Sequence, residues 1–126
     1  MSIHQLHDPR TYQIIGAAME VHRILHRGLL EQIYCEALAV EFELLAIPFA
    51  QQVPCQVVYK KRRLTGYHRI DFVCFDELVV EVKASTLTGP VEQAQVLNYL
   101  ALSGHRLGLL LNFGRPSLEY KRFVLD

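Results

Sequence analysis

The chain has 126 residues, a length typical of one domain, so we expect a single domain over residues 1–126. Its 13 basic and 13 acidic residues cancel to a formal net charge of +0, which excludes a global attraction to nucleic acid or membranes. No apolar run is long enough to span a membrane, and no signal-peptide pattern opens the chain. Three cysteines without metal-ligand spacing are expected to be reduced, so we expect a soluble cytoplasmic protein that makes no membrane contact.

The first part of the chain is expected to be helical. Apolar residues recur at helical spacing through residues 11–25 and again, after Gly28, through residues 29–46. The second helix is expected to end before Pro48, because the residue that precedes a proline disfavours the α conformation.

Beyond Pro48 the pattern changes to that of strands, rich in β-branched residues. Strands are expected at residues 53–60, 68–75, 78–84, 106–113 and 118–125, with one helix at residues 88–104. A polar turn that contains Gly66 joins the first two strands, and Thr88 is a candidate N-cap for the helix. This order predicts an α/β fold, a three-layer-like sandwich around a mixed β-sheet.

The hairpin "RIDFVCFDELVVEVKA", Arg69 to Ala84, carries acids within apolar strands. Alternation is expected to place Asp71 opposite the face of Ile70, Phe72 and Cys74, and Glu81 with Lys83 opposite the face of Val80, Val82 and Ala84. The two charged faces coincide only if the connection has an odd number of residues, for example the three residues 76–78. An even turn would bury an acid in the core at a cost of several kcal/mol, so we expect the odd connection.

Two converging carboxylates need a cation, and Mg²⁺ prefers hard oxygen ligands of this kind. A lysine beside the metal, here Lys83, can stabilise a phosphoryl transition state or orient a water. The alternative is a plain ion pair between Asp71 and Lys83 with a solvated Glu81.

The segment "GLLEQIY" contains Gly28, Glu31 and Tyr34 at the defining positions of the GxxExxY protein family. The resemblance continues through "EVHRIL", "VVYKKRRLTGYHRIDFV", "VVEVKA", "AQVLNYL" and "GLLLNFG", over about residues 12 to 125. That family resembles the PD-(D/E)XK nuclease superfamily. The resemblance implies a restriction-endonuclease-like αβββαβ core, here with an extra N-terminal helix and a C-terminal strand.

The resemblance also implies roles for individual residues. Asp71, Glu81 and Glu31 fall on acids that hold Mg²⁺ or Mn²⁺, with the Val82 carbonyl as a further ligand. Together with Lys83, which would polarise the attacking water or stabilise the phosphate, the three acids form the expected catalytic set. The chain departs from the pattern at three places: Ile70 stands where the motif name has proline, Glu92 stands where the family usually has histidine, and "LHRG" replaces the more usual "LGPG" before the signature helix.

Substrate contacts are expected from three places. Gln95 and Tyr99 resemble a Gln-x-x-x-Tyr element, and Tyr34 lies on the same helical face as Glu31. The alternative for the two tyrosines is helix–sheet packing, and for Gln95 a hydrogen bond to a helix end or a neighbouring carbonyl. The basic run that begins with Lys60 and Lys61, extended by Arg69, suits a phosphate backbone or is a solvated hairpin tip.

The leading hypothesis is a metal-dependent, nuclease-like protein that hydrolyses phosphodiester bonds in nucleic acid, with DNA favoured over RNA. The first alternative is a nucleic-acid-binding module on the same fold that does not cut. The second alternative is an assembly subunit, in which the C-terminal strand pairs across a homodimer.

Overall fold

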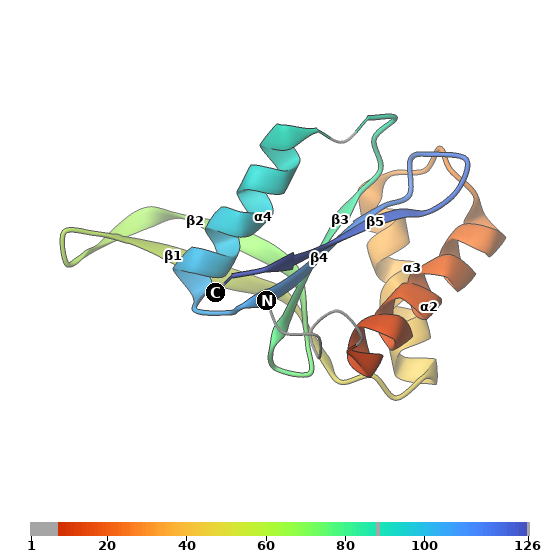
Figure 1. Ribbon diagram of the computed structural model, residues 1–126, viewed down its shortest axis with the longest axis horizontal. Helices are drawn as coiled ribbons and strands as arrows, with labels where there is room; N and C mark the ends of the chain where they lie inside the picture. The colour runs from red at the N-terminus through yellow and green to blue at the C-terminus, as the bar shows by residue number, and fades with distance from the viewer. Residues whose placement is uncertain (1–7, 88, 126) are drawn as a thin grey trace.

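The computed structural model describes residues 8–87 and 89–125 (Figure 1). Three helices and five strands occur in these two ranges. In chain order they are α2 (Pro9–Leu25), α3 (Glu31–Leu44), β1 (Phe49–Tyr59), β2 (Arg62–Cys74), β3 (Leu78–Lys83), α4 (Pro90–Ser103), β4 (Leu107–Asn112) and β5 (Glu119–Val124). This order confirms the predicted αβββαβ core with an added N-terminal helix and C-terminal strand.

The five strands form one sheet in the order β1-β2-β3-β4-β5. Only β3 and β4 are parallel, and the other neighbouring pairs are antiparallel. Helix α4 makes the crossover that a parallel pair requires. The predicted mixed sheet is therefore confirmed, and the strands follow one another in space as they do in the sequence.

Helices cover both faces of the sheet, which gives three layers (Figure 1). Helices α2 and α3 pack on one face, where Phe72, Val80 and Leu109 are fully buried. Helix α4 packs on the other face, where Val96 and Leu100 contact the alternate strand residues. Because β3 and β4 are covered on both sides, they consist almost entirely of buried apolar residues.

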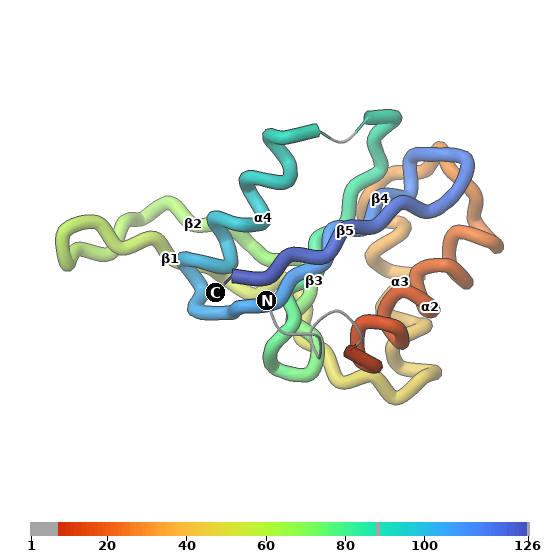
Figure 2. The backbone as a smooth tube through the Cα atoms, viewed as in Figure 1, coloured from red at the N-terminus to blue at the C-terminus, as the bar shows by residue number. Residues whose placement is uncertain are grey.

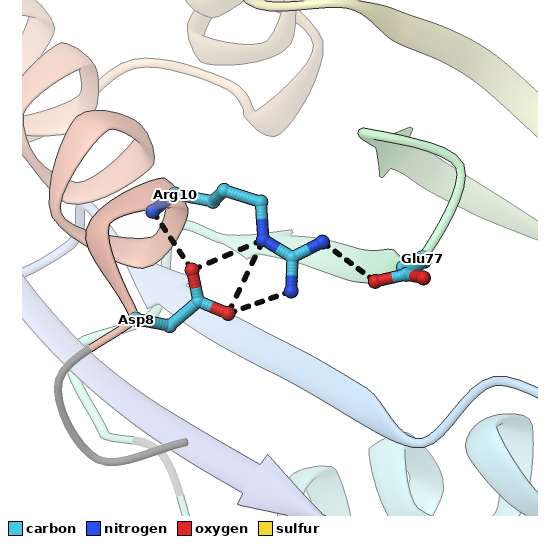
Figure 3. Close-up of polar contacts among 3 residues, drawn as sticks. All are labelled: Asp8, Arg10 and Glu77. Atoms are coloured by element: carbon cyan, nitrogen blue, oxygen red, sulfur yellow. Dashed lines mark hydrogen bonds and ion pairs between the residues drawn. The ribbon is translucent and has the colours of Figure 1, made fainter. Parts of the chain in front are cut away.

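The start of α2 is tied to the turn between β2 and β3 (Figure 3). Asp8 caps the helix by accepting from the Arg10 backbone N–H at 2.9 Å, and its carboxylate also pairs with the Arg10 guanidinium at 2.7 Å. The same guanidinium donates to Glu77 at 2.6 Å. One arginine thus fixes the first turn of the helix against the far end of the hairpin that carries the acids.

The connection between β1 and β2 differs from the prediction. The expected polar turn at residues 60–68 is only the two residues Lys60 and Lys61, and β2 begins directly at Arg62. Strand β1 also begins earlier than expected, at Phe49. The result is a long two-stranded ribbon whose tip extends away from the rest of the protein (Figure 2).

Helix α4 begins at Pro90 with Gly89 as its N-cap, and Thr88, the residue expected there, lies outside the described residues. The Glu92 carboxylate accepts from the Gly89 N–H at 2.9 Å. Glu92, the departure from the family pattern, therefore stabilises the start of the helix. The helix ends as expected at Gly104, whose φ of 79° is one that glycine adopts readily.

Within the described residues, we find no helix that is long and apolar enough to cross a membrane.

Candidate functional site

The turn between β2 and β3 decides which side chains of the two strands meet. Cys74 pairs with Leu78 and Phe72 with Val80, so three residues, 75–77, connect the strands. The connection has the expected odd length, although it lies one residue earlier than expected. Continued by one step, this register sets Asp71 opposite Glu81.

The faces of β2 differ from the expectation of strict alternation. Phe72 packs under α2 and α3 as expected, but Ile70 packs in the cluster under α4. Strand β1 exchanges faces at the same level, with Phe49 in the first cluster and Val53 in the second. Gln52, between them, has a φ of 52°, which is uncommon for a residue with a side chain. The prediction that Ile70 shares a face with Phe72 is therefore wrong, because the ribbon twists here.

The twist separates β2 from β3 just beyond the Phe72–Val80 pair. If the pairing of β2 with β3 continued, Ile70 would lie opposite Val82. The pairing stops, and the Val82 N–H donates to the Asp71 carboxylate at 2.8 Å. The N–H and C=O of one strand residue point to the same neighbour, so the Val82 carbonyl also faces the gap beside Asp71. Asp71 and the Val82 backbone thus come together where the two strands diverge.

Glu81 is the most unusual group of this region. It is only 4% exposed, and burial together with the negative charge of Asp71 raises the pKa of Glu81 to about 9. A buried acid beside a second carboxylate is the donor set that a divalent cation stabilises. We find no group of three His, Cys, Asp or Glu side chains poised to hold a metal ion in residues 8–87 and 89–125. A metal site here would therefore be built on the two acids and the Val82 carbonyl.

A cleft of about 570 Å³ opens on the α3 side of the gap, and Glu31, Cys35 and Asp71 are among its lining residues. Glu31 is the exposed first residue of α3, at the helix end where a carboxylate is favourable. Cys35 lies one turn further on. Burial, followed by the charges of Asp71, Glu31 and Glu81, raises the pKa of Cys35 to about 12. Glu31 and Asp71 therefore line the same cleft, and all three acids lie near enough to Cys35 to raise its pKa.

Tyr34 holds the loop that precedes α3. Its hydroxyl donates to the His26 carbonyl at 2.5 Å and accepts from the Leu29 N–H at 3.1 Å. Its ring is fully buried and stacks on Phe113 with 4.7 Å between centroids. Gly28, within this loop, has a φ of 107°. The prediction that Tyr34 binds substrate is wrong: ring and hydroxyl are both engaged inside the protein, where they position Glu31.

His68 is a site residue that the sequence reasoning missed. Its Nε2 lies 3.2 Å from the Glu81 carboxylate, and its ring stacks on Tyr99 of α4 with 3.7 Å between centroids and 7° between planes. Burial lowers the pKa of His68 and raises that of Tyr99. Tyr99 thus lies beside the acids through its contact with His68. His68 is three residues from Asp71, and nothing in that spacing predicts a contact with Glu81.

The end of β3, which carries Lys83, is fixed by Asn112. The Asn112 amide accepts from the Ser85 and Gly114 N–H groups and donates to the Ser85 carbonyl, at 2.9 to 3.1 Å. A Cβ on Gly114 would lie 2.3 Å from the Ser85 carbonyl oxygen, so this close approach requires glycine. Lys83 is half-buried, and its charge lowers the pKa of Glu81, against the larger effect of burial.

The remaining predicted substrate residues lie at the surface. Gln95 is exposed on α4, one turn before Tyr99, and its side chain has no hydrogen-bond partner among the described residues. Arg69 is exposed and lies over the Tyr67 ring. Lys60 and Lys61 form the tip of the ribbon, away from the acids. The structure thus brings Asp71, Glu81 and Val82 together, with Lys83 on the same strand and Glu31 in the cleft beside Asp71. Tyr99 lies beside them through His68, and Lys60 and Lys61 lie at the far tip of the ribbon.

Comparison with known proteins gives one finding. The family model described as the PD-(D/E)XK nuclease superfamily matches residues 8–123. No curated protein and no solved structure matches the chain. Among the described elements, the match spans all three helices and nearly all of the sheet, including each acid described above. The chain therefore belongs to the PD-(D/E)XK nuclease superfamily.

Proposed function

We propose that this protein is a metal-dependent nuclease that hydrolyses phosphodiester bonds in nucleic acid, with DNA as the favoured substrate. One observation carries the proposal: the buried Glu81 carboxyl lies beside Asp71 at the point where β2 and β3 diverge. An uncompensated pair of acids is unfavourable in a core, and a divalent cation compensates it. The three free cysteines fit a reducing compartment, and we propose the cytoplasm.

The groups that would bind the metal lie at the gap where β2 and β3 diverge and across the neighbouring cleft. Asp71, Glu81 and the Val82 carbonyl would bind Mg²⁺ or Mn²⁺, and Glu31 would bind directly or through a water across the cleft. The chemistry supplied by a bound divalent cation is activation of water and neutralisation of charge on the phosphate. The Tyr34 hydroxyl and the Asn112 amide set the positions of Glu31 and Lys83 before any ligand arrives.

Lys83 would stabilise the negative charge that develops on the phosphate, or orient the attacking water. His68 would keep the Glu81 carboxylate in one orientation, because Tyr99 holds the imidazole ring in place by stacking. Both contributions are electrostatic and positional, which is the greater part of catalysis in phosphate chemistry.

A cleavage screen tests the proposal. Labelled DNA and RNA, each single-stranded and double-stranded, would be incubated with Mn²⁺ and with the wild-type protein, Asp71→Ala or Lys83→Ala. We expect metal-dependent cleavage by the wild type and none by Asp71→Ala, with the folded state retained in both variants. Cleavage by Asp71→Ala at the wild-type rate would overturn the assignment.

Titration calorimetry separates a nuclease from a binding module that does not cut. We expect Mg²⁺ or Mn²⁺ to bind the wild type and to bind Glu81→Gln more weakly, because a neutral amide replaces a charged ligand. Equal metal binding by the two proteins would contradict the proposed site.

A further inference from the structure

The neutral net charge of the chain conceals a strong separation of charge. Residues 49–70, which form β1, the tip and most of β2, contain five bases and no acid: Lys60, Lys61, Arg62, Arg63 and Arg69. The rest of the chain keeps 13 − 5 = 8 bases against all 13 acids, a formal charge of −5. A net charge of +5 is therefore concentrated on this one ribbon, and the rest of the chain is net acidic.

We call residues 56–67, the outer part of this ribbon, the arm. None of its residues is buried, and all but Val57 are exposed, so the arm adds nothing to either core cluster. An isolated two-stranded ribbon is marginally stable in water. An extension of this length is thus not explained by folding, and it leaves Tyr59 and Tyr67 open to solvent beside the cations.

The tip of the arm presents two lysines in an unusual conformation. Lys60 and Lys61 have φ angles of 49° and 66°, the pattern of a tight hairpin turn that asparagine and glycine normally occupy. Lysine at both positions is less favourable for the backbone, and it sets two cations at the farthest point of the arm. The Lys60 ammonium lies over the Tyr59 ring, 5.5 Å from its centroid.

The arm and the metal centre are parts of one ribbon. Gln52 lies at the level of Asp71, and Tyr59 is seven residues further along β1. At about 3.3 Å per residue, Tyr59 at the end of β1 is roughly 23 Å from the acids, which is about seven base pairs of duplex at 3.4 Å each. A duplex with one phosphate at the acids would thus pass along the arm.

The shape of the arm favours one kind of duplex. The major groove of B-form DNA, about 12 Å wide, admits a two-stranded ribbon. The major groove of A-form RNA is too deep and narrow for side chains to read. We propose that the arm enters the major groove of double-stranded DNA and holds the duplex across the metal centre. The lysines and arginines would contact phosphates, and Val58 and Leu64, both exposed, would contact base methyl groups.

This inference rests on the proposed function only in taking the bound duplex as the substrate, and binding can be measured without cleavage. Fluorescence anisotropy in EDTA would follow a labelled 20-base-pair DNA duplex and the RNA duplex of the same sequence over a range of salt. We expect tighter binding of DNA by the wild type. In Lys60→Gln/Lys61→Gln we expect the slope of log affinity against log salt to fall by about 2, roughly one for each phosphate contact, with the preference for DNA reduced.

The control pair, Arg23→Gln/Lys121→Gln, removes the same charge from exposed positions outside the arm and should leave both measurements nearly unchanged. Arg62→Gln/Arg63→Gln repeats the test with the tip intact. Equal effects of arm and control pairs, or equal binding of RNA and DNA duplexes, would overturn the inference. If the arm binds DNA but Mn²⁺ supports no cleavage, the proposed function fails and the inference stands. If cleavage persists without any contribution from the arm, the inference alone fails.

Discussion

Replacing Glu81 with glutamine tests whether this acid is held neutral in the metal-free protein. The pKa of Glu81 is raised from 4.5 to about 9, first by burial and then by Asp71. Between these two values the folded state binds a proton that the unfolded state has released. The free energy of unfolding therefore falls as the pH rises through this window. Glutamine has nearly the same shape and cannot ionise, so it removes this part of the pH dependence.

The size of the effect follows from the shift. Each pH unit in the window corresponds to about 1.36 kcal/mol, so from pH 4.5 to pH 7 the wild type loses roughly 3 kcal/mol. The Glu81 side chain is 5% exposed, which leaves little solvent to screen the effect. In EDTA at pH 7 or 8 the Glu81→Gln variant should therefore be the more stable protein, by several degrees in Tm.

The assay is thermal unfolding by circular dichroism in EDTA at pH 5, 6, 7 and 8. We expect the Tm of Glu81→Gln to exceed that of the wild type by an amount that grows with pH. Glu43→Gln replaces an exposed acid on α3 and serves as the control. Its Tm should depend on pH in the same way as the Tm of the wild type. If the Tm of Glu81→Gln also followed the wild-type dependence on pH, Glu81 would not be held neutral in the folded protein. Added Mg²⁺ at pH 8 should then stabilise the wild type more than Glu81→Gln, because bound ligand stabilises the folded state.

Three further predictions concern stability. Tyr34→Phe removes the hydroxyl that bonds the loop before α3, and should lower the free energy of unfolding in urea by roughly 2 kcal/mol; an unchanged midpoint would contradict that role. Gly114→Ala should lower the free energy of unfolding by about 3 kcal/mol or more, because the added Cβ would collide with the Ser85 backbone. Gly16→Ala has open space around it in α2 and should leave the free energy of unfolding unchanged or raise it by up to about 1 kcal/mol. Arg10→Met should cost about 1–2 kcal/mol in the same measurement, since it releases Glu77 from the start of α2; a larger loss in 1 M salt than in low salt would argue against an ionic cause.

Local patterns were sufficient to predict the elements and their order. The helical spacing before Pro48, the β-branched runs after it and the glycine at position 104 each depend on neighbours a few residues away. Parity along the strands also predicted that Asp71 and Glu81 would meet, because burying an acid in the core is costly. The structure has that odd connection, at residues 75–77.

The details that failed depend on contacts between distant segments. Ile70 changes faces because β1 and β2 twist together at Gln52, and strict alternation contains no sign of such a twist. Tyr34 was assigned to substrate because its spacing from Glu31 predicts a shared helical face. Its true partners are a loop carbonyl and Phe113, nearly 80 positions away in the chain. His68 was missed for the same reason, since its contact with Glu81 exists only because the ribbon has twisted.

The separation of charge between the ribbon and the rest of the protein makes the molecule an electric dipole. In the field of a polyanion such a molecule experiences a torque, so it would arrive with the basic tip of the ribbon foremost. A uniformly basic protein of the same size would adhere in many orientations, most of them unproductive. We therefore expect salt to slow the encounter with DNA while altering the orientation of the bound protein little. A chain with no net charge can in this way approach its target in one preferred orientation.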